Sequence, residues 1–107
     1  MNDTLTRIRE LVAVGDVRVS EHGYDQLAAD EILVRDILNG VGGAGVVEDY
    51  PGFGKGPAVL VLQSDHDGRP VHVVWGIPKG HNRPAVLVTA YRPDPQRWSA
   101  DFLERRR

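Results

Sequence analysis

The stretch Ala58–Ile77, AVLVLQSDHDGRPVHVVWGI, decides the expected fold. Its two ends are rich in valine and other residues that favour β-strands, which predicts strands over residues 58–63 and 71–77. Between them, Asp67-Gly68 favours a tight hairpin turn, and such a turn joins antiparallel neighbours. Two further glycine-punctuated segments, residues 46–50 and 85–91, have the same character. We therefore expect four strands in one antiparallel sheet.

Helix signals precede the strands. Asp3 or Thr4 can cap a first helix, and Gly15 can end it. Ser20 is a good N-cap for a short second helix, and Asp30 for a third. Residues 17–19, between the first two helices, are expected to form a brief extended stretch and are not counted among the four candidate strands.

The segment after the last strand predicts one more helix. Pro93 and Pro95 stop the strand, and a short helix is expected from Gln96 to Glu104, bringing Trp98 and Phe102 towards the core. The expected fold class is α+β, with N-terminal helices packed on a four-stranded antiparallel sheet and a short C-terminal helix.

Size and composition exclude several classes of protein. The 107 residues suit a single domain spanning residues 1–107. Without cysteine, the chain has no disulfide, no thiolate nucleophile and no thiolate zinc site. The N-terminus lacks a cationic segment leading into an apolar run, and all apolar runs are short. We therefore expect a cytoplasmic protein without a cleaved signal peptide or a membrane span.

Alternation along the last two strands predicts which side chains share a face. His72 lies on one face of the strand at residues 71–77. In the strand at residues 85–91, alternate side chains share a face: Ala85, Leu87, Thr89 and Tyr91. His72 can then align with Thr89 and Tyr91, although a register slip of one residue would exchange the faces.

His22 and His72 are candidate acid-base residues, because neutral imidazole is the side chain best suited to move a proton near pH 7. His22 falls in the first turn of the helix that Ser20 caps. Together with Thr89 and Tyr91, the two histidines can form a small acid-base site. The alternatives are a surface or capping role for His22 and a His72 satisfied by hydrogen bonds inside the sheet.

Other motifs point to no cofactor. Gly52–Gly56 lacks phosphate-loop spacing, and we interpret it as a mobile loop that closes over a ligand. Asp65–Gly68 lacks the further ligands of a calcium loop and is better explained as a hairpin turn. The four histidines show no metal-ligand spacing. We expect neither a metal nor a cofactor.

Several motifs in a fixed order carry a family resemblance: Ser20-Glu21-His22 at a helix start, Ile32 in the next helix, Val46–Tyr50, Gly68–Val74 and Val88–Asp94. Over residues from about 17 to 98, the chain resembles the bacterial family called domain of unknown function 4258. The resemblance implies a small α+β domain similar to the RelE-like and barnase-like toxin ribonucleases. Such proteins often pair with an antitoxin, so the resemblance implies an RNA substrate and an antitoxin-like protein partner.

The same resemblance implies roles for individual residues. Metal-independent RNA cleavage needs a base for the ribose 2′-OH, an acid for the leaving oxygen and cations at the scissile phosphate. By resemblance, His22 and His72 would be the base and the acid, in either order. Thr89 and Tyr91 would orient the phosphate, and Arg92 would neutralise it.

The cations near this expected site are few. Lys79 and Arg83, in the loop before the last strand, are further candidate substrate-binding residues. Gln26 stands where many family members have an arginine, and Asp30-Glu31 stands where a basic residue is expected. Missing cations imply a weak nuclease, another substrate or binding alone.

The leading hypothesis is a toxin-like, metal-independent endoribonuclease. The alternative is a non-catalytic protein-interaction domain on the same fold, because acidic side chains predominate in residues 1–50 and basic ones in residues 51–107, although the net charge is only −2. A small-molecule enzyme is a third hypothesis. Convergence of His22 and His72 on a common point would favour either enzyme over a protein that only binds.

Overall fold

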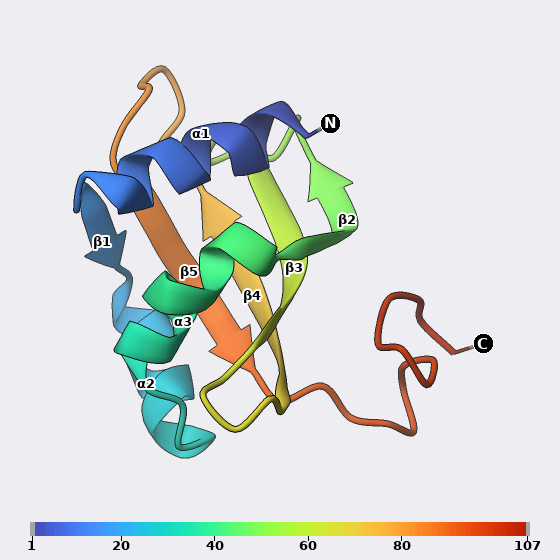
Figure 1. Cartoon of the computed structure of the whole chain (residues 1–107). Coiled ribbons are helices and arrows are strands. Elements are labelled where there is room, and N and C mark those ends of the chain that lie inside the picture. Colours follow the sequence, from blue (N-terminus) through green and yellow to red (C-terminus); the bar gives the residue numbers. More distant parts are fainter. Residues whose placement is uncertain (1, 107) are drawn as a thin grey trace.

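Residues 2–106, which the computed structural model describes, fold into a five-stranded β-sheet and three α-helices (Figure 1). The helices are α1 (Asp3–Ala13), α2 (Glu21–Ala29) and α3 (Val34–Gly40), and α3 continues into the 3₁₀ turn η1 (Val41–Gly43). The strands are β1 (Val17–Val19), β2 (Gly45–Tyr50), β3 (Ala58–Ser64), β4 (Pro70–Gly76) and β5 (Ala85–Tyr91). In the described residues, no helix has the length and apolar character needed to cross a membrane.

The sheet is mixed, with the strand order β1-β5-β4-β3-β2. β1 runs parallel to β5, and the other neighbouring pairs are antiparallel. The α+β class is therefore confirmed, but the prediction of four strands, all antiparallel, is wrong. The added strand is β1, in which Val17 pairs with Ala85 and Val19 with Leu87. Three residues are too few to show a strand's alternation, and a parallel partner lies far away in the chain.

The β3–β4 hairpin forms as predicted. Its register pairs Ala58 with Gly76 and Ser64 with Pro70. Gly68 adopts a φ of +78°, a conformation that glycine allows at little cost, and its amide donates to the Asp65 carbonyl at 3.0 Å.

The core lies between the sheet and the helices α1 and α3, which cross the same face of the sheet (Figure 1). Ile8 of α1, Ile37 of α3 and Trp75 of β4 are all fully buried there. Gln63 crosses this core: its amide donates to the Ile37 carbonyl at 2.9 Å and accepts from the Trp75 indole N–H at 3.0 Å. The only buried amide side chain among the described residues thus has its hydrogen bonds satisfied.

A β-bulge in β5 changes the predicted faces. Leu87 pairs with Trp75 and Thr89 with Val74, so Val88 is an extra residue in β5. Leu87 therefore belongs to the core, whereas Thr89 falls on the opposite face. The prediction that Ala85 and Leu87 share a face with Thr89 and Tyr91 is wrong, because the bulge restarts the alternation in mid-strand.

The first two helices begin at side-chain caps. Asn2, and not Asp3 or Thr4, caps α1, because its side-chain oxygen accepts from the Leu5 amide at 2.8 Å. Ser20 caps α2 as predicted.

Asp30 does not cap the third helix. α3 begins only at Val34, after Leu33, and Asp30 instead ends α2. The Asp30 carboxylate accepts from the Arg92 backbone amide at 2.7 Å, so it holds the end of β5.

Residues 93–106, the C-terminal cover, form no helix, and the prediction of one over residues 96–104 is wrong. Phe102 has a φ of +62°, and a β-bridge between Trp98 and Arg105 closes the segment into a turn. Side-chain oxygens of Ser99 and Asp101 accept backbone amides there, which offers the chain an alternative to helical hydrogen bonds. Trp98 is nevertheless buried, as expected.

Candidate functional site

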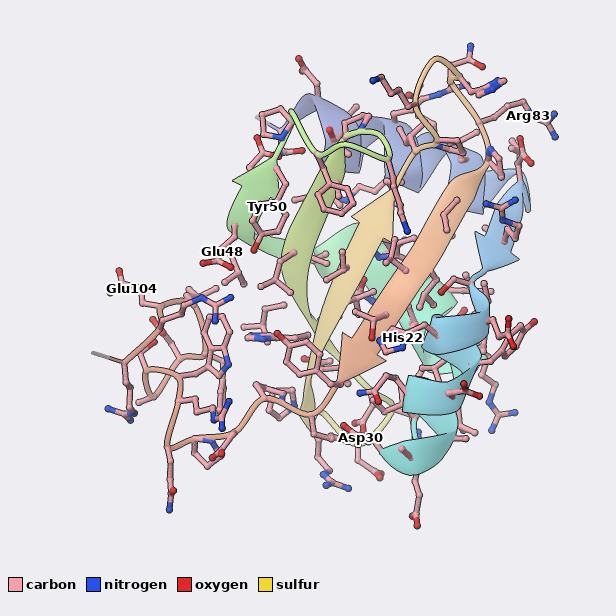
Figure 2. All side chains as sticks on the ribbon, turned by 180° about the vertical axis from the view of Figure 1, so that it is seen from behind. His22, Asp30, Glu48, Tyr50, Arg83 and Glu104 are labelled. Atoms are coloured by element: carbon pink, nitrogen blue, oxygen red, sulfur yellow. The ribbon has the colours of Figure 1, made fainter. Side chains whose placement is uncertain are left out.

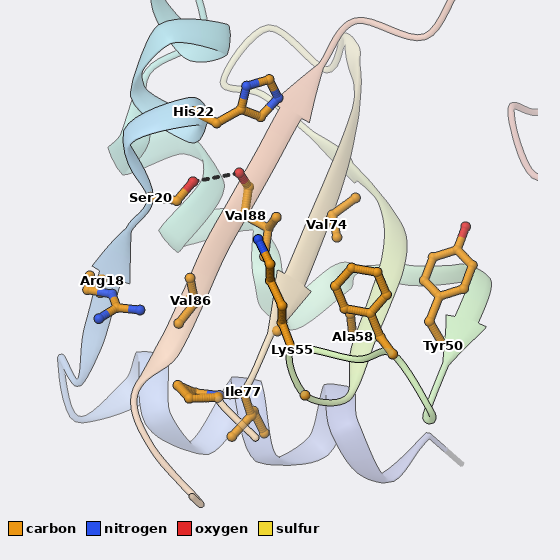
Figure 3. Close-up of a pocket in the computed structure, with 14 residues that line it drawn as sticks. Arg18, Ser20, His22, Tyr50, Lys55, Ala58, Val74, Ile77, Val86 and Val88 are labelled. Carbon is orange, nitrogen blue, oxygen red and sulfur yellow. Dashed lines mark hydrogen bonds between the residues drawn. The ribbon is translucent and has the colours of Figure 1, made fainter. Parts of the chain in front are cut away.

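A cleft of about 570 Å³ opens on the sheet face opposite α1 and α3 (Figure 3). Its floor is apolar and is formed by Ala58, Val74, Gly76, Val86 and Val88. The larger side chains that line the cleft are Arg18, His22, Tyr50, Phe53 and Lys55. Figure 3 shows Arg18 and His22 at one side of the floor and Tyr50 at the other. This volume suits a small-molecule group or a short segment of a larger ligand.

The start of α2 places His22 beside the cleft. The Ser20 hydroxyl accepts from the Gly23 amide at 2.9 Å and donates to the Val88 carbonyl of β5 at 2.7 Å. A Cβ atom on Gly23 would lie 2.9 Å from the Leu87 carbonyl oxygen, so only glycine lets the helix approach the strand this closely. His22 therefore projects from a fixed helix turn, with an exposed ring.

The β2–β3 loop, residues 51–57, forms the opposite wall. The Lys55 carbonyl accepts from the Lys79 amide, and the Pro57 carbonyl from the Ile77 amide, each at 3.0 Å. Gly56 has a φ of +123°, and a Cβ atom there would lie 2.0 Å from the Ile77 carbonyl oxygen. The glycine-rich segment singled out in the sequence thus lines the cleft, with its last residues held against the chain after β4.

The charge of the cleft is positive. Arg18 and Lys55 line it, and the lining residues include no carboxylate. Within residues 2–106, neither cation forms a salt bridge. Both charges are therefore available to an anionic ligand.

His72 lies outside this cleft, buried beneath the C-terminal cover. Its Nε2 donates to the Phe102 carbonyl at 2.8 Å, because a carbonyl oxygen can only accept. Its Nδ1 is 3.2 Å from the Tyr91 hydroxyl and, in the neutral ring, accepts from it. The Trp98 ring packs edge-on at a centroid distance of 4.4 Å. Burial lowers the pKa of His72, so the ring stays neutral, as a satisfied structural histidine does.

An ion pair between Arg105 and Glu48 anchors the cover to β2. Figure 2 shows Glu48 on the side of the sheet nearest the cover. The Arg105 guanidinium donates twice to the Glu48 carboxylate, at 2.9 and 3.0 Å, and stacks over the Trp98 ring at 4.7 Å. The hydrogen bonds from Arg105 lower the pKa of Glu48. The Tyr50 hydroxyl also donates to Glu48, which connects this anchor to the cleft wall.

The predicted catalytic residues therefore do not form one group. His22 lines the cleft, whereas His72 and Tyr91 contact each other under the cover. Thr89 stands on the same sheet face, paired with Val74, but does not line the cleft.

The predicted substrate-binding cations lie elsewhere. Arg92 forms an ion pair with Asp65 at 2.9 Å, and Arg83 donates to the Asp16 carboxylate, with one bond of 2.9 Å. Lys79 is exposed in the β4–β5 loop and is not part of the cleft lining. Within residues 2–106, no three His, Cys, Asp or Glu side chains gather closely enough to hold a metal ion.

Comparison with known proteins identifies the family. A family model described as a domain of unknown function, DUF4258, matches residues 19–92, more than half of the chain. The chain belongs to the DUF4258 family. Neither the curated proteins nor the solved structures gave a significant match.

The DUF4258 match includes most of the cleft but not all of it. His22, Phe53 and Lys55 lie inside the matched range, whereas Arg18 and the C-terminal cover lie outside. The sequence patterns did not indicate Arg18 or Tyr50 as site residues, and they indicated Phe53 only as part of the Gly52–Gly56 loop. A cation between two valines in β1 is a usable signal for Arg18, since alternation turns it away from the core.

Proposed function

We propose that this DUF4258 protein is a toxin-like, metal-independent ribonuclease that works at the cleft of Figure 3, with His22 as the proton-transfer residue. The observation that carries the proposal is the set of residues around His22. Its exposed imidazole lines a cleft together with Arg18 and Lys55, which form no salt bridge among the described residues, and no carboxylate lines this cleft. Cleavage of a phosphodiester needs a proton acceptor and positive charge near the phosphate. A RelE-like relationship, with an RNA substrate and an antitoxin-like partner, is part of this proposal.

The residues present suggest the following chemistry. Neutral His22 takes the proton from a ribose 2′-OH, and the resulting oxygen attacks the adjacent phosphorus. The bond from phosphorus to the 5′ oxygen breaks, a 2′,3′-cyclic phosphate forms, and the departing oxygen takes a proton from a water molecule. The hydroxide left behind takes back the proton that His22 carries, which returns the ring to its neutral form. Arg18 and Lys55 offset the charge that builds on the phosphate.

His72 receives a different role in this proposal from the one expected of it. It acts in the fold, by holding the C-terminal cover through Phe102, and does not transfer a proton. Tyr91 supports it from the other side. A site with one histidine lacks a side chain that acts as the acid, and the sequence also lacks cations at two positions where the family resemblance leads us to expect them. Both features predict slow cleavage.

The test is induced expression of the wild type and of His22→Ala, with growth and total RNA followed at matched protein levels. Wild-type expression should arrest growth and degrade RNA. Loss of a general base should lower cleavage about 100- to 10,000-fold. Tyr91→Phe is the matched control, because it removes one hydroxyl beside His72 and should leave cleavage nearly unchanged. Intact RNA with the wild type, in cells and with purified protein, would overturn the proposal.

The alternative function is a non-catalytic protein-interaction domain. It is favoured by the apolar cleft floor and by the exposed ring of Phe53 beside it. It predicts a stable complex with the product of a neighbouring gene, formed equally well by His22→Ala and lost when Phe53 is replaced by a charged residue. Recovery of no partner from the native host would count against it.

A further inference from the structure

We infer that Tyr50, Phe53 and Lys55 form a subsite for one unpaired nucleobase and its phosphate, which makes single-stranded RNA the substrate class. The choice of RNA as the ligand rests on the proposed function, but the subsite stands on its own geometry. It lies on the wall of the cleft opposite the α2 helix that carries His22 (Figure 3).

The two aromatic rings are the first observation. Phe53 is 54% exposed and Tyr50 is 37% exposed, although large aromatic side chains usually supply burial. Among the described residues, neither ring stacks on another aromatic ring. Every base offers a flat π-face, so an exposed ring beside an apolar floor can receive a base of any identity.

Hydrogen bonds hold the Tyr50 side chain and the backbone at Phe53 in place without a ligand. The Tyr50 hydroxyl donates to Glu48, which Arg105 holds in turn, so the ring has a fixed end. The Phe53 amide donates to the Tyr50 carbonyl at 3.3 Å, and the Gly56 amide to the Phe53 carbonyl at 3.0 Å. A wall held in this way loses little conformational entropy when it binds.

Charge selects the class of ligand. Lys55 belongs to the same loop as Phe53, and Arg18 lines the cleft from β1, so a phosphate next to the stacked base would meet positive charge. In a duplex, each base is covered by its neighbours and cannot leave the stack without unpairing. The subsite therefore favours single strands over duplexes and tolerates any base sequence.

The experiment measures binding apart from cleavage. His22→Ala protein is titrated, at fixed salt concentration, into a fluorescent six-nucleotide RNA, the same backbone without bases, and a duplex of equal length. The single strand should bind most tightly. Adding Phe53→Ala should weaken its binding by roughly 5- to 150-fold, the range expected for one stacked base. Phe53→Trp is the matched control and should keep the affinity, because it retains a ring.

Equal binding of the base-free backbone, or no effect of Phe53→Ala, would overturn the subsite. So would the absence of binding to all three probes, the result expected if the cleft accepts a protein segment. Wild-type protein that binds single strands through Phe53 but never cuts them would overturn the proposed ribonuclease and leave the subsite intact. If Phe53→Ala protein that keeps His22 cuts RNA as fast as the wild type, the subsite is overturned and the proposed ribonuclease stands.

Discussion

Replacing Gly56 with alanine should destabilise the protein by about 2–6 kcal/mol. A φ of +123° costs a residue with a Cβ atom about 1–3 kcal/mol. The new Cβ atom would also stand 2.0 Å from the Ile77 carbonyl oxygen and 2.6 Å from the Lys79 amide nitrogen. Both atoms belong to the backbone, so relief requires the chain to move, at about 1–3 kcal/mol more.

Gly80→Ala separates these two costs. Gly80 also has a positive φ, +78°, but a Cβ atom there meets nothing within 4 Å. Gly80→Ala should therefore lower the free energy of unfolding by only about 1–2 kcal/mol, which is the cost of the left-handed backbone conformation for a residue with a Cβ atom.

Urea denaturation of both variants, followed by tryptophan fluorescence, provides the assay. Trp75 and Trp98 are both buried and report unfolding. If the two variants lose the same free energy of unfolding, the close contact between the β2–β3 loop and the chain after β4 does not exist as described.

Three further predictions concern the supports of the fold. Gln63→Leu leaves the Trp75 indole N–H without a partner and should lower the free energy of unfolding by about 1–3 kcal/mol; an unchanged urea midpoint would contradict this. Gly23→Ala should cost about 1–3 kcal/mol by pushing α2 off β5, and should reduce RNA cleavage in the folded protein; wild-type stability would show that the approach is not tight. Hydrogen bonding to Asp36 raises the pKa of His66 above 6.5 and lowers the pKa of Asp36. The pair thus contributes its full stability below pH 6.5, where His66 is charged in both states, and loses it as the pH rises through the raised pKa or falls through that of Asp36. His66→Gln should therefore lower the melting temperature more at pH 5.5 than at pH 8.5, and equal losses at both pH values would refute the pairing.

Local patterns predicted much of the sheet. The four antiparallel strands and the hairpin at Gly68 follow from valine-rich alternation and from one turn dipeptide. Ser20 was identifiable as a cap because its chemistry acts within three residues of its position. Each of these features depends only on residues that are close together in the sequence, so a short stretch is enough to predict it.

The remaining features depend on contacts between distant segments. β1 becomes a strand only because β5 offers it an edge, and the extra residue Val88 appears only when β4 and β5 are paired. The cleft could not be predicted for the same reason, because Arg18 and Lys55 line one cleft only when β1 is part of the sheet. The hydrogen bond from His72 to the Phe102 carbonyl could not be predicted, because the sequence pattern favours a helix over residues 96–104 instead of the turn that places this carbonyl.

The bond from Ser20 to Val88 spans 68 residues of sequence, and it has a consequence for the order in which the molecule assembles. α1, β1 and α2 are synthesised first, yet α2 has no strand to rest on until β5 has been made and paired. Contacts of such long range form late in folding, because the intervening chain must be ordered first. A chain still growing on the ribosome would therefore carry His22 without a cleft, and any activity at this site would begin only when β5 is in place.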